Sequence, residues 1–219
     1  MKKGDLPALH RAARFGDLAG VGAMLESGAD VNSRWGPEQL TALHLAAESG
    51  QLEVLQALIQ AGADVDSVCL PFGENALHIA AYRGHTEVAA ALSRSSVPVT
   101  SLDLKRRTPL HYAAEGGHGT VTVAEFLLAG GAGFDEIDAE GDSPLMLAAL
   151  RSSLAMVHLL SRLGADPSHT NAYGQTAVDI AMLQLDALPR IGRGRTRRVH
   201  PDYVYIERDV IDILRLMRL

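Results

Sequence analysis

Six copies of one short pattern, spaced about 33 residues apart, constrain the fold of this chain more than any other feature. Successive copies lie 34, 34, 33, 35 and 33 residues apart, and in each the first two residues are followed by one further residue and then by alanine. A fixed period of this length predicts a stack of similar helical units, each of which buries its apolar face against its neighbours. The copies begin at Leu9-His10, Leu43-His44, Leu77-His78, Leu110-His111, Leu145-Met146 and Val178-Asp179.

The fourth copy, which runs from Thr108 to His118, indicates how each unit starts and stops. The Thr108 hydroxyl is suited to cap a helix, and Pro109 suits the first helical position because its missing N–H is not needed there. We expect Gly117 to end this helix in a left-handed conformation. A second amphipathic helix follows, and a Gly-Ala-Asp sequence closes units one, two and five.

With Thr-Pro-Leu-His-Tyr-Ala at residues 108–113 and a period near 33, the chain resembles the ankyrin-repeat family over nearly its whole length. The resemblance implies an all-α solenoid of about six helix-turn-helix repeats with β-hairpin fingers, in a single domain over residues 1–219. An insertion at about residues 188–205 is expected to split the last repeat, whose second helix resumes with Ile206, Val210, Ile213, Leu214 and Met217 on one face. The repeats are expected at about residues 5–36, 37–70, 71–103, 104–138, 139–171 and 172–219.

Two irregularities fall between residues 93 and 122. Repeat three ends in Ser93 to Pro98 without a Gly-Ala-Asp sequence, so its junction with repeat four is poorly specified. Repeat four has two extra residues between Gly117 and Leu127, which we expect Gly119 to Thr122 to hold as an extra turn or bulge. Because a stack of repeats is weakest at its worst interface, the sequence predicts a hinge or register change here.

Composition narrows the class of partner. The net charge of −6 argues against a chain that as a whole seeks nucleic acid or an anionic membrane, and no uncharged stretch approaches the roughly 20 residues that span a bilayer. The single cysteine, Cys69, excludes an intramolecular disulfide and suits a reducing compartment. We expect a monomer in the cytoplasm, with the nucleus as the alternative.

One segment is strongly basic, and it supports a second hypothesis. Its five arginines lie within nine residues, so the remaining residues carry a net charge of −6 − 5 = −11. Three interpretations remain open: a solvated loop, recognition of phosphate, nucleic acid or an acidic protein segment, and a nuclear-import address. The alternative function is therefore an anion- or nucleic-acid-associated adaptor that uses Arg190, Arg193, Arg195, Arg197 and Arg198.

The histidines do not indicate catalysis. Six of the nine occupy equivalent positions in the repeats, where the resemblance implies local hydrogen bonds for His10, His44, His78 and His111. His-Glu-x-x-His, Cys-x-x-Cys and Gly-x-Ser-x-Gly motifs are absent, and Cys69 is expected to be a solvent-exposed finger residue without an activating base. We therefore predict no catalytic residue, no metal site and no cofactor.

The resemblance implies a scaffold or adaptor that binds another protein through its concave side, formed by the finger tips and the exposed ends of the first helices. Aromatic and arginine side chains most often dominate binding energy, at about 2 kcal/mol or more for a buried anchor, and aromatic residues are only 5% of this chain. The alternative for each aromatic is that it folds back against a neighbouring finger. The expected contacts are Trp35, Phe72, Lys105, Arg107 and Tyr173 on fingers and Glu48, Tyr82, Arg83, Tyr112 and Glu115 on first helices. The same places also hold Glu38, Glu74, Glu140 and Asp142 on fingers and Arg14, Phe15 and Arg151 on first helices.

Overall fold

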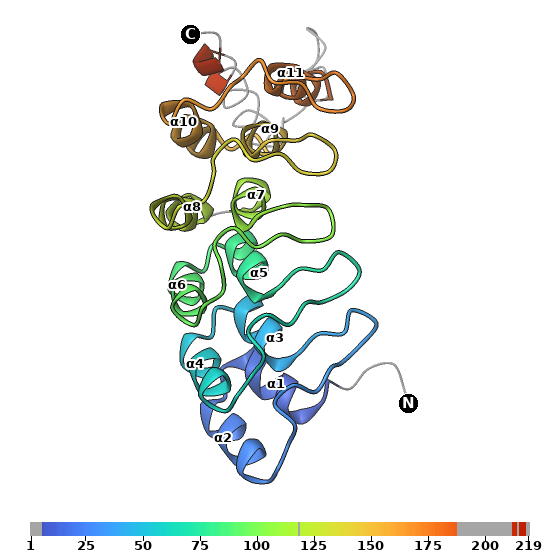
Figure 1. Ribbon diagram of the computed structural model, residues 1–219, viewed down its shortest axis with the longest axis vertical. Helices are drawn as coiled ribbons and strands as arrows, with labels where there is room; N and C mark the ends of the chain where they lie inside the picture. Colours follow the sequence, from blue (N-terminus) through green and yellow to red (C-terminus); the bar gives the residue numbers. More distant parts are fainter. Residues whose placement is uncertain (1–5, 118, 188–211, 214, 218–219) are drawn as a thin grey trace, which may run out of the picture. The chain divides into compact units, whose positions relative to one another are not determined.

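The computed structural model describes residues 6–117, 119–187, 212–213 and 215–217. Within these ranges the regular structure is helical apart from two isolated antiparallel bridges, so the prediction of an all-α fold is confirmed (Figure 1). The helices are α1 (Ala8–Phe15), α2 (Leu18–Glu26), α3 (Ala42–Glu48), α4 (Leu52–Gln60), α5 (Ala76–Arg83), α6 (Thr86–Arg94), α7 (Pro109–Glu115), α8 (Thr120–Ala129), α9 (Pro144–Leu150), α10 (Leu154–Arg162) and α11 (Ala177–Ala187).

The chain divides into two compact units, Met1–Ala132 and Gly133–Leu219. The first unit holds α1 to α8 and the second holds α9 to α11. The division falls near the expected boundary between repeats four and five. A single domain over the whole chain stays a prediction.

In the first unit, α1, α3, α5 and α7 form one row, and each packs against the next helix of the row (Figure 1). Their partners α2, α4, α6 and α8 form the second row. Alanine pairs such as Ala80-Ala81 and Ala113-Ala114 are almost fully buried between neighbours, which lets the helices approach closely. Long loops precede α3, α5 and α7, and they project from the first row.

The repeat histidine fixes the start of three inner helices, which are the first helices of their repeats: α3, α5 and α7. In α3 the Thr41 side chain accepts a hydrogen bond from the His44 amide, and His44 Nδ1 in turn contacts the backbone N–H and the hydroxyl of Thr41. The same reciprocal capping occurs in α5 and α7, with Asn75 and Thr108 as the capping residues. The histidines are therefore structural parts of the helix starts, as the resemblance implied.

The first repeat lacks this arrangement because Pro7 stands at the capping position of α1. Proline supplies neither a hydroxyl nor an N–H, and Nδ1 of the buried His10 accordingly has no hydrogen-bond partner among the residues that the structure describes. The other ring nitrogen of His10 bonds to the Leu40 carbonyl at 3.1 Å, as the loop to the next repeat passes over it.

The junction after α6 is more regular than the sequence suggests. Gly62 closes repeat two in a left-handed conformation, and the next amide, that of Ala63, bonds to the Leu58 carbonyl at 3.0 Å. Ser96 takes the same position with φ +76°, and the Val97 amide bonds to the Leu92 carbonyl at 3.2 Å. The expectation of a poorly specified turn was wrong, because a serine adopts the backbone conformation that glycine adopts elsewhere.

The link between α7 and α8 also differs from expectation. Gly117 is not left-handed; the glycine with positive φ is Gly119, at φ +84°, directly before α8. Gly116 continues in an extended conformation, where a Cβ would collide with the carbonyl oxygen of Tyr82. Thr120 is already the first residue of α8, so one of the two extra residues lies in the link before α8, and the other lengthens the helix, which has 10 residues where α4 has 9. The hinge stays a prediction.

In the second unit, α9 packs against α10 and α11. Ser143 caps α9 by accepting a bond from the Met146 amide, whereas at α11 Asp179 takes the histidine position and accepts from both the backbone N–H and the hydroxyl of Thr176. Ile213 and Met217, expected on the apolar face of the last helix, are buried. The expected insertion, and with it Ile206, Val210 and Leu214, lies outside the described residues.

Candidate partner-binding pocket

The first unit carries a pocket of about 500 Å³, built from equivalent positions of three successive repeats. The position just before the helix-capping residue is occupied in the three repeats by Leu40, Glu74 and Arg107. A position in the last turn of the first helix of each repeat is occupied by Glu48, Tyr82 and Glu115. The repeat register therefore brings side chains far apart in sequence to one surface. The lining is Leu40, His44, Glu48, Phe72, Glu74, Ile79, Tyr82, Arg83, Lys105, Arg107, Tyr112 and Glu115.

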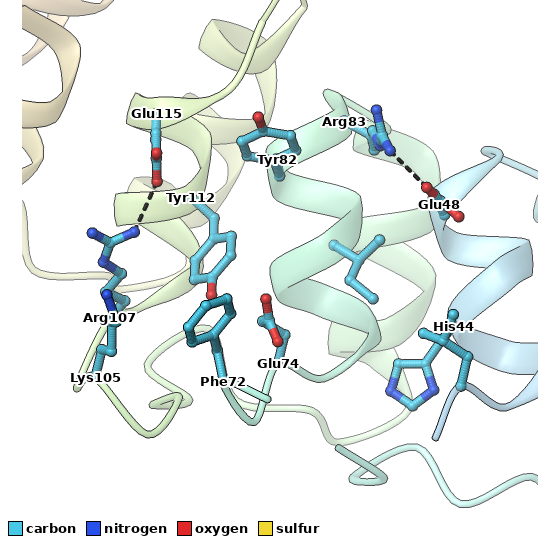
Figure 2. A pocket seen from close by; sticks show the side chains of 12 residues that line it. His44, Glu48, Phe72, Glu74, Tyr82, Arg83, Lys105, Arg107, Tyr112 and Glu115 are labelled. Atoms are coloured by element: carbon cyan, nitrogen blue, oxygen red, sulfur yellow. Dashed lines mark hydrogen bonds and ion pairs between the residues drawn. The ribbon is translucent and has the colours of Figure 1, made fainter. Parts of the chain in front are cut away.

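Two ion pairs lie at the two ends of this pocket (Figure 2). At one end Arg83 Nη2 is 2.6 Å from Glu48 Oε1, which joins α5 to α3. At the other end Arg107 Nη1 is 2.8 Å from Glu115 Oε2, and this pair is the less exposed of the two. The exposed Arg83–Glu48 pair contributes little stability, since water screens it, but it holds both side chains in place.

Glu74 lies between these ion pairs (Figure 2). It is half-buried, and in the part of the chain that the structure describes no ion pair reaches its carboxylate. Among the described residues, its one close side-chain partner is the Cys69 thiol, with Sγ 3.5 Å from Glu74 Oε2. Glu74 is thus the acidic group of the pocket that remains without a cationic partner.

Aromatic rings form much of the wall around Glu74. The Tyr82 and Tyr112 rings meet edge to face with their centroids 6.5 Å apart, which is a favourable arrangement for aromatic pairs. Two cations lie over ring faces at the rim: the Arg83 guanidinium is 5.8 Å from the Tyr82 centroid, and Lys105 Nζ is 5.3 Å from the Phe72 centroid. The pocket therefore combines π faces with charged groups.

Tyr112 was expected to face outward, but it is buried, with only 9% of its surface exposed. Its hydroxyl donates a 2.8 Å hydrogen bond to Asp103 Oδ2, and its ring packs edge to face against His78. Burial, the bond to Asp103 and the charge of Glu74 all raise the pKa of the Tyr112 hydroxyl, which stays a neutral donor. Tyr112 forms the back wall of the pocket.

The loops on the open side of the pocket are linked backbone to backbone. The Leu70 amide bonds to the Glu38 carbonyl at 2.7 Å, and the Leu104 amide bonds to the Phe72 carbonyl at 2.8 Å. In the second unit the Ala172 amide makes the same kind of bond, at 2.9 Å, to Glu140. On the linked loops of the first unit Leu70, Phe72 and Leu104 are 47%, 44% and 73% exposed; Phe72 lines the pocket, and the backbone of Leu104 is bonded to that of Phe72.

Eight of the ten expected contact residues line the pocket: Glu48, Phe72, Tyr82, Arg83, Lys105, Arg107, Tyr112 and Glu115. Trp35 does not; it is half-buried and pairs with Leu40 in an antiparallel bridge, through amide bonds of 2.8 and 2.9 Å. Tyr173 belongs to the second unit, where it is 69% exposed. The five arginines from Arg190 to Arg198 lie outside the described residues, so a role for them in anion binding stays a prediction.

Three lining residues were not expected on the recognition surface: Leu40, His44 and Ile79. Glu74 was placed on that surface by its finger position but was not singled out as a contact. Ile79 occupies the same repeat position as Tyr112, so the repeat register was the signal that could have found it. His44 was assigned a structural role, and its contacts agree with that role. Its Nε2 lies 3.0 Å from the Ser67 carbonyl, and burial lowers its pKa to about 4.

Cys69, expected to be solvent-exposed, is buried with 5% exposure. Its amide bonds to the Glu74 carbonyl across the narrow end of the loop, which turns the side chain inward. Burial, followed by the nearby Glu74 carboxylate, raises the pKa of the thiol to about 12. The thiolate is therefore disfavoured, which argues against a nucleophilic role.

Among the described residues no three histidine, cysteine or carboxylate side chains gather as a metal site would require. None of the helices in these ranges is both long enough and apolar enough to cross a membrane.

Comparison with known proteins identifies the repeats. A family model described as ankyrin repeats in three copies matches residues 2–69 and 43–132, and one for a single ankyrin repeat matches residues 140–172. The chain is 38% identical over 81 residues to the transient receptor potential cation channel subfamily A member 1 of Drosophila melanogaster, which is 37% of this chain and 7% of that protein. It is also 38% identical over 85 residues to an ankyrin repeat and LEM domain-containing protein 1 homolog of Caenorhabditis elegans, which is 38% of this chain and 12% of that protein. The matches thus span a small part of each relative.

Proposed function

The chain belongs to the ankyrin-repeat family, and we propose that it is a scaffold or adaptor that binds a partner protein at the pocket of its first unit. Ankyrin repeats are protein–protein interaction modules. The proposal assigns no catalytic step to the pocket, because repeats of this kind typically serve as non-enzymatic scaffolds.

One observation carries the choice of surface. Three successive repeats contribute aromatic and charged side chains to one pocket, and the loops beside it expose Leu70, Phe72 and Leu104. Interface centres are enriched in aromatic and arginine residues, and the largest losses of affinity on truncation occur at such residues. Phe72 and Tyr82 meet this description, since both line the pocket and neither is fully buried.

The test is partner capture with a double variant, Phe72→Ala with Tyr82→Ala. Wild type and variant are used as baits in extracts of the source cells, and bound proteins are quantified by mass spectrometry. We expect loss of the specifically captured proteins, because each anchor contributes roughly 2 kcal/mol or more. The matched control is Phe15→Ala, which truncates a phenylalanine that is 72% exposed on α1, outside the pocket.

Two results would contradict the proposal. Capture that survives the double variant would place the binding surface elsewhere, and capture that is lost equally in Phe15→Ala would not be specific to the pocket. The helical circular dichroism signal and the melting temperature of each variant show whether it is folded.

A further inference from the structure

We propose that the pocket selects a partner segment with one basic side chain, arginine or lysine, which enters between Tyr82, Tyr112 and Phe72 and pairs with Glu74. This inference rests on the proposed function and names the chemistry of the partner. It follows from how the charges of the pocket are distributed.

Six charged side chains line the pocket, three acidic and three basic. Glu48 and Glu115 are already paired, with Arg83 and Arg107. Glu74 is the remaining acid, and among the described residues it has no cationic partner. A partner's cation therefore finds one carboxylate free to receive it, without breaking an ion pair that the pocket uses to hold its shape.

The surroundings of Glu74 make a charge pair there stronger than one at the surface. Glu74 is half-buried and lies near Tyr112 (Figure 2), in a pocket whose lining also includes Ile79 and Tyr82. A charge pair in such a partly desolvated site is screened less than an exposed one. A second carboxylate, that of Asp103, lies behind Tyr112 and bonds to its hydroxyl. At the Tyr112 hydroxyl the charges of Glu74 and Asp103 act in the same direction, and the charge of Arg107 opposes them with a smaller effect on the pKa.

The rings favour a cation for a second reason. The faces of tyrosine and phenylalanine attract ammonium and guanidinium groups, and planar guanidinium also stacks on them. The rim already shows this preference, with Arg83 over Tyr82 and Lys105 over Phe72. An acidic side chain would be repelled by Glu74, and a neutral side chain would leave the Glu74 carboxylate without a charged partner.

Exposed apolar side chains near the pocket indicate which residues of the partner would flank its basic side chain. Phe72 lines the pocket, and Leu70 and Leu104 are exposed on the same linked loops. Burying such surface is favourable at about 25 cal/mol per Å² of apolar area. The partner segment is thus an apolar stretch interrupted by one arginine or lysine.

A random-sequence peptide library, selected on the full chain, tests this inference. We expect the selected peptides to share one basic position with apolar neighbours. Synthetic copies, labelled with a fluorophore and measured by fluorescence anisotropy, should lose at least about tenfold in affinity when that residue becomes glutamine, since charge-assisted hydrogen bonds are lost. The Glu74→Gln variant should remove this discrimination between basic and glutamine peptides.

The matched control is Glu53→Gln, which removes the same charge from the exposed face of α4, outside the pocket. It should keep the full discrimination. Selected peptides without a basic position, or discrimination that survives Glu74→Gln, would overturn the inference. If such peptides still lose binding to the Phe72→Ala, Tyr82→Ala variant, the pocket remains the binding surface and the inference alone fails. If they bind that variant as tightly as wild type, the proposed function fails as well.

Discussion

The Tyr112 hydroxyl donates a 2.8 Å hydrogen bond to Asp103 Oδ2, and this bond fastens α7 to the loop that forms the rim of the pocket. The other carboxylate oxygen of Asp103 accepts the backbone amides of Lys105 and Arg107, each at 2.8 Å. One buried carboxylate thus joins the back wall to the two cationic residues at the rim. The pocket keeps its shape through this contact.

Replacing Tyr112 by phenylalanine should lower the free energy of unfolding by about 1–3 kcal/mol. The variant leaves the buried Asp103 carboxylate without one of its donors, and an unsatisfied buried acceptor costs about this much. Urea denaturation followed by circular dichroism measures the change.

Tyr82→Phe is the matched control, because within the described residues the Tyr82 hydroxyl makes no hydrogen bond and its loss should change stability by less than about 0.5 kcal/mol. If Tyr112→Phe and Tyr82→Phe change the free energy of unfolding equally, the hydrogen bond from Tyr112 to Asp103 does not contribute to stability.

The fold could be predicted because its signals are local and repeated. Thr108, Pro109 and His111 specify a helix start by themselves, and the period then fixes what packs against it. The turn at Ser96 could not be predicted, since the residue type gives no sign of the left-handed backbone there. Its conformation is imposed by the helices on either side, as Val97 and Val99 are buried beyond it.

Ser96→Gly should raise the free energy of unfolding by up to about 1 kcal/mol. Serine at φ +76° is strained, whereas glycine adopts this conformation without a Cβ clash. Gly62→Ser, at the equivalent turn of repeat two, is the reverse substitution. No atom lies within 4 Å of a Cβ added at Gly62, so the added side chain meets no neighbour and only the strain of the left-handed backbone remains. We therefore expect Gly62→Ser to lower the free energy of unfolding by a similar amount. An Ser96→Gly variant that is less stable than wild type would contradict this account of the turn.

The candidate site was predicted in part, and the misses have a common cause. Position in the repeat identified Phe72 and Tyr82, but Tyr112 was placed on the surface because its bond to Asp103 joins a loop and a helix that no local pattern connects. Glu74 was placed on this surface by its finger position but was not singled out as a contact, because its importance comes from the pairing of its neighbours, which is a property of side-chain packing.

Acid should destabilise the fold through its neutral, buried histidines. The pKa of His44 is lowered to about 4 by burial, so its contribution to stability is fully present above pH 6.5 and is lost as the pH falls from 6.5 towards 4. A shift of this size corresponds to about 3 kcal/mol. The pKa values of His10 and His78 are lowered as well, also by burial.

Two measurements check this. The urea midpoint should fall steadily between pH 6.5 and pH 4.5, and NMR of the histidine rings should show His44 still neutral at pH 5.5. A His44 ring that titrates near pH 6.5 in the folded protein would refute the assignment of this pH dependence to it.

Hydrogen–deuterium exchange of the chain with and without a captured partner tests the central claim most directly. The account predicts added protection in the loops around Phe72 and Lys105 and at the last turns of α5 and α7, since these segments form the pocket. It predicts little change in α9 and α10. Protection confined to the second unit or to residues 188–205, with none at the pocket, would contradict it.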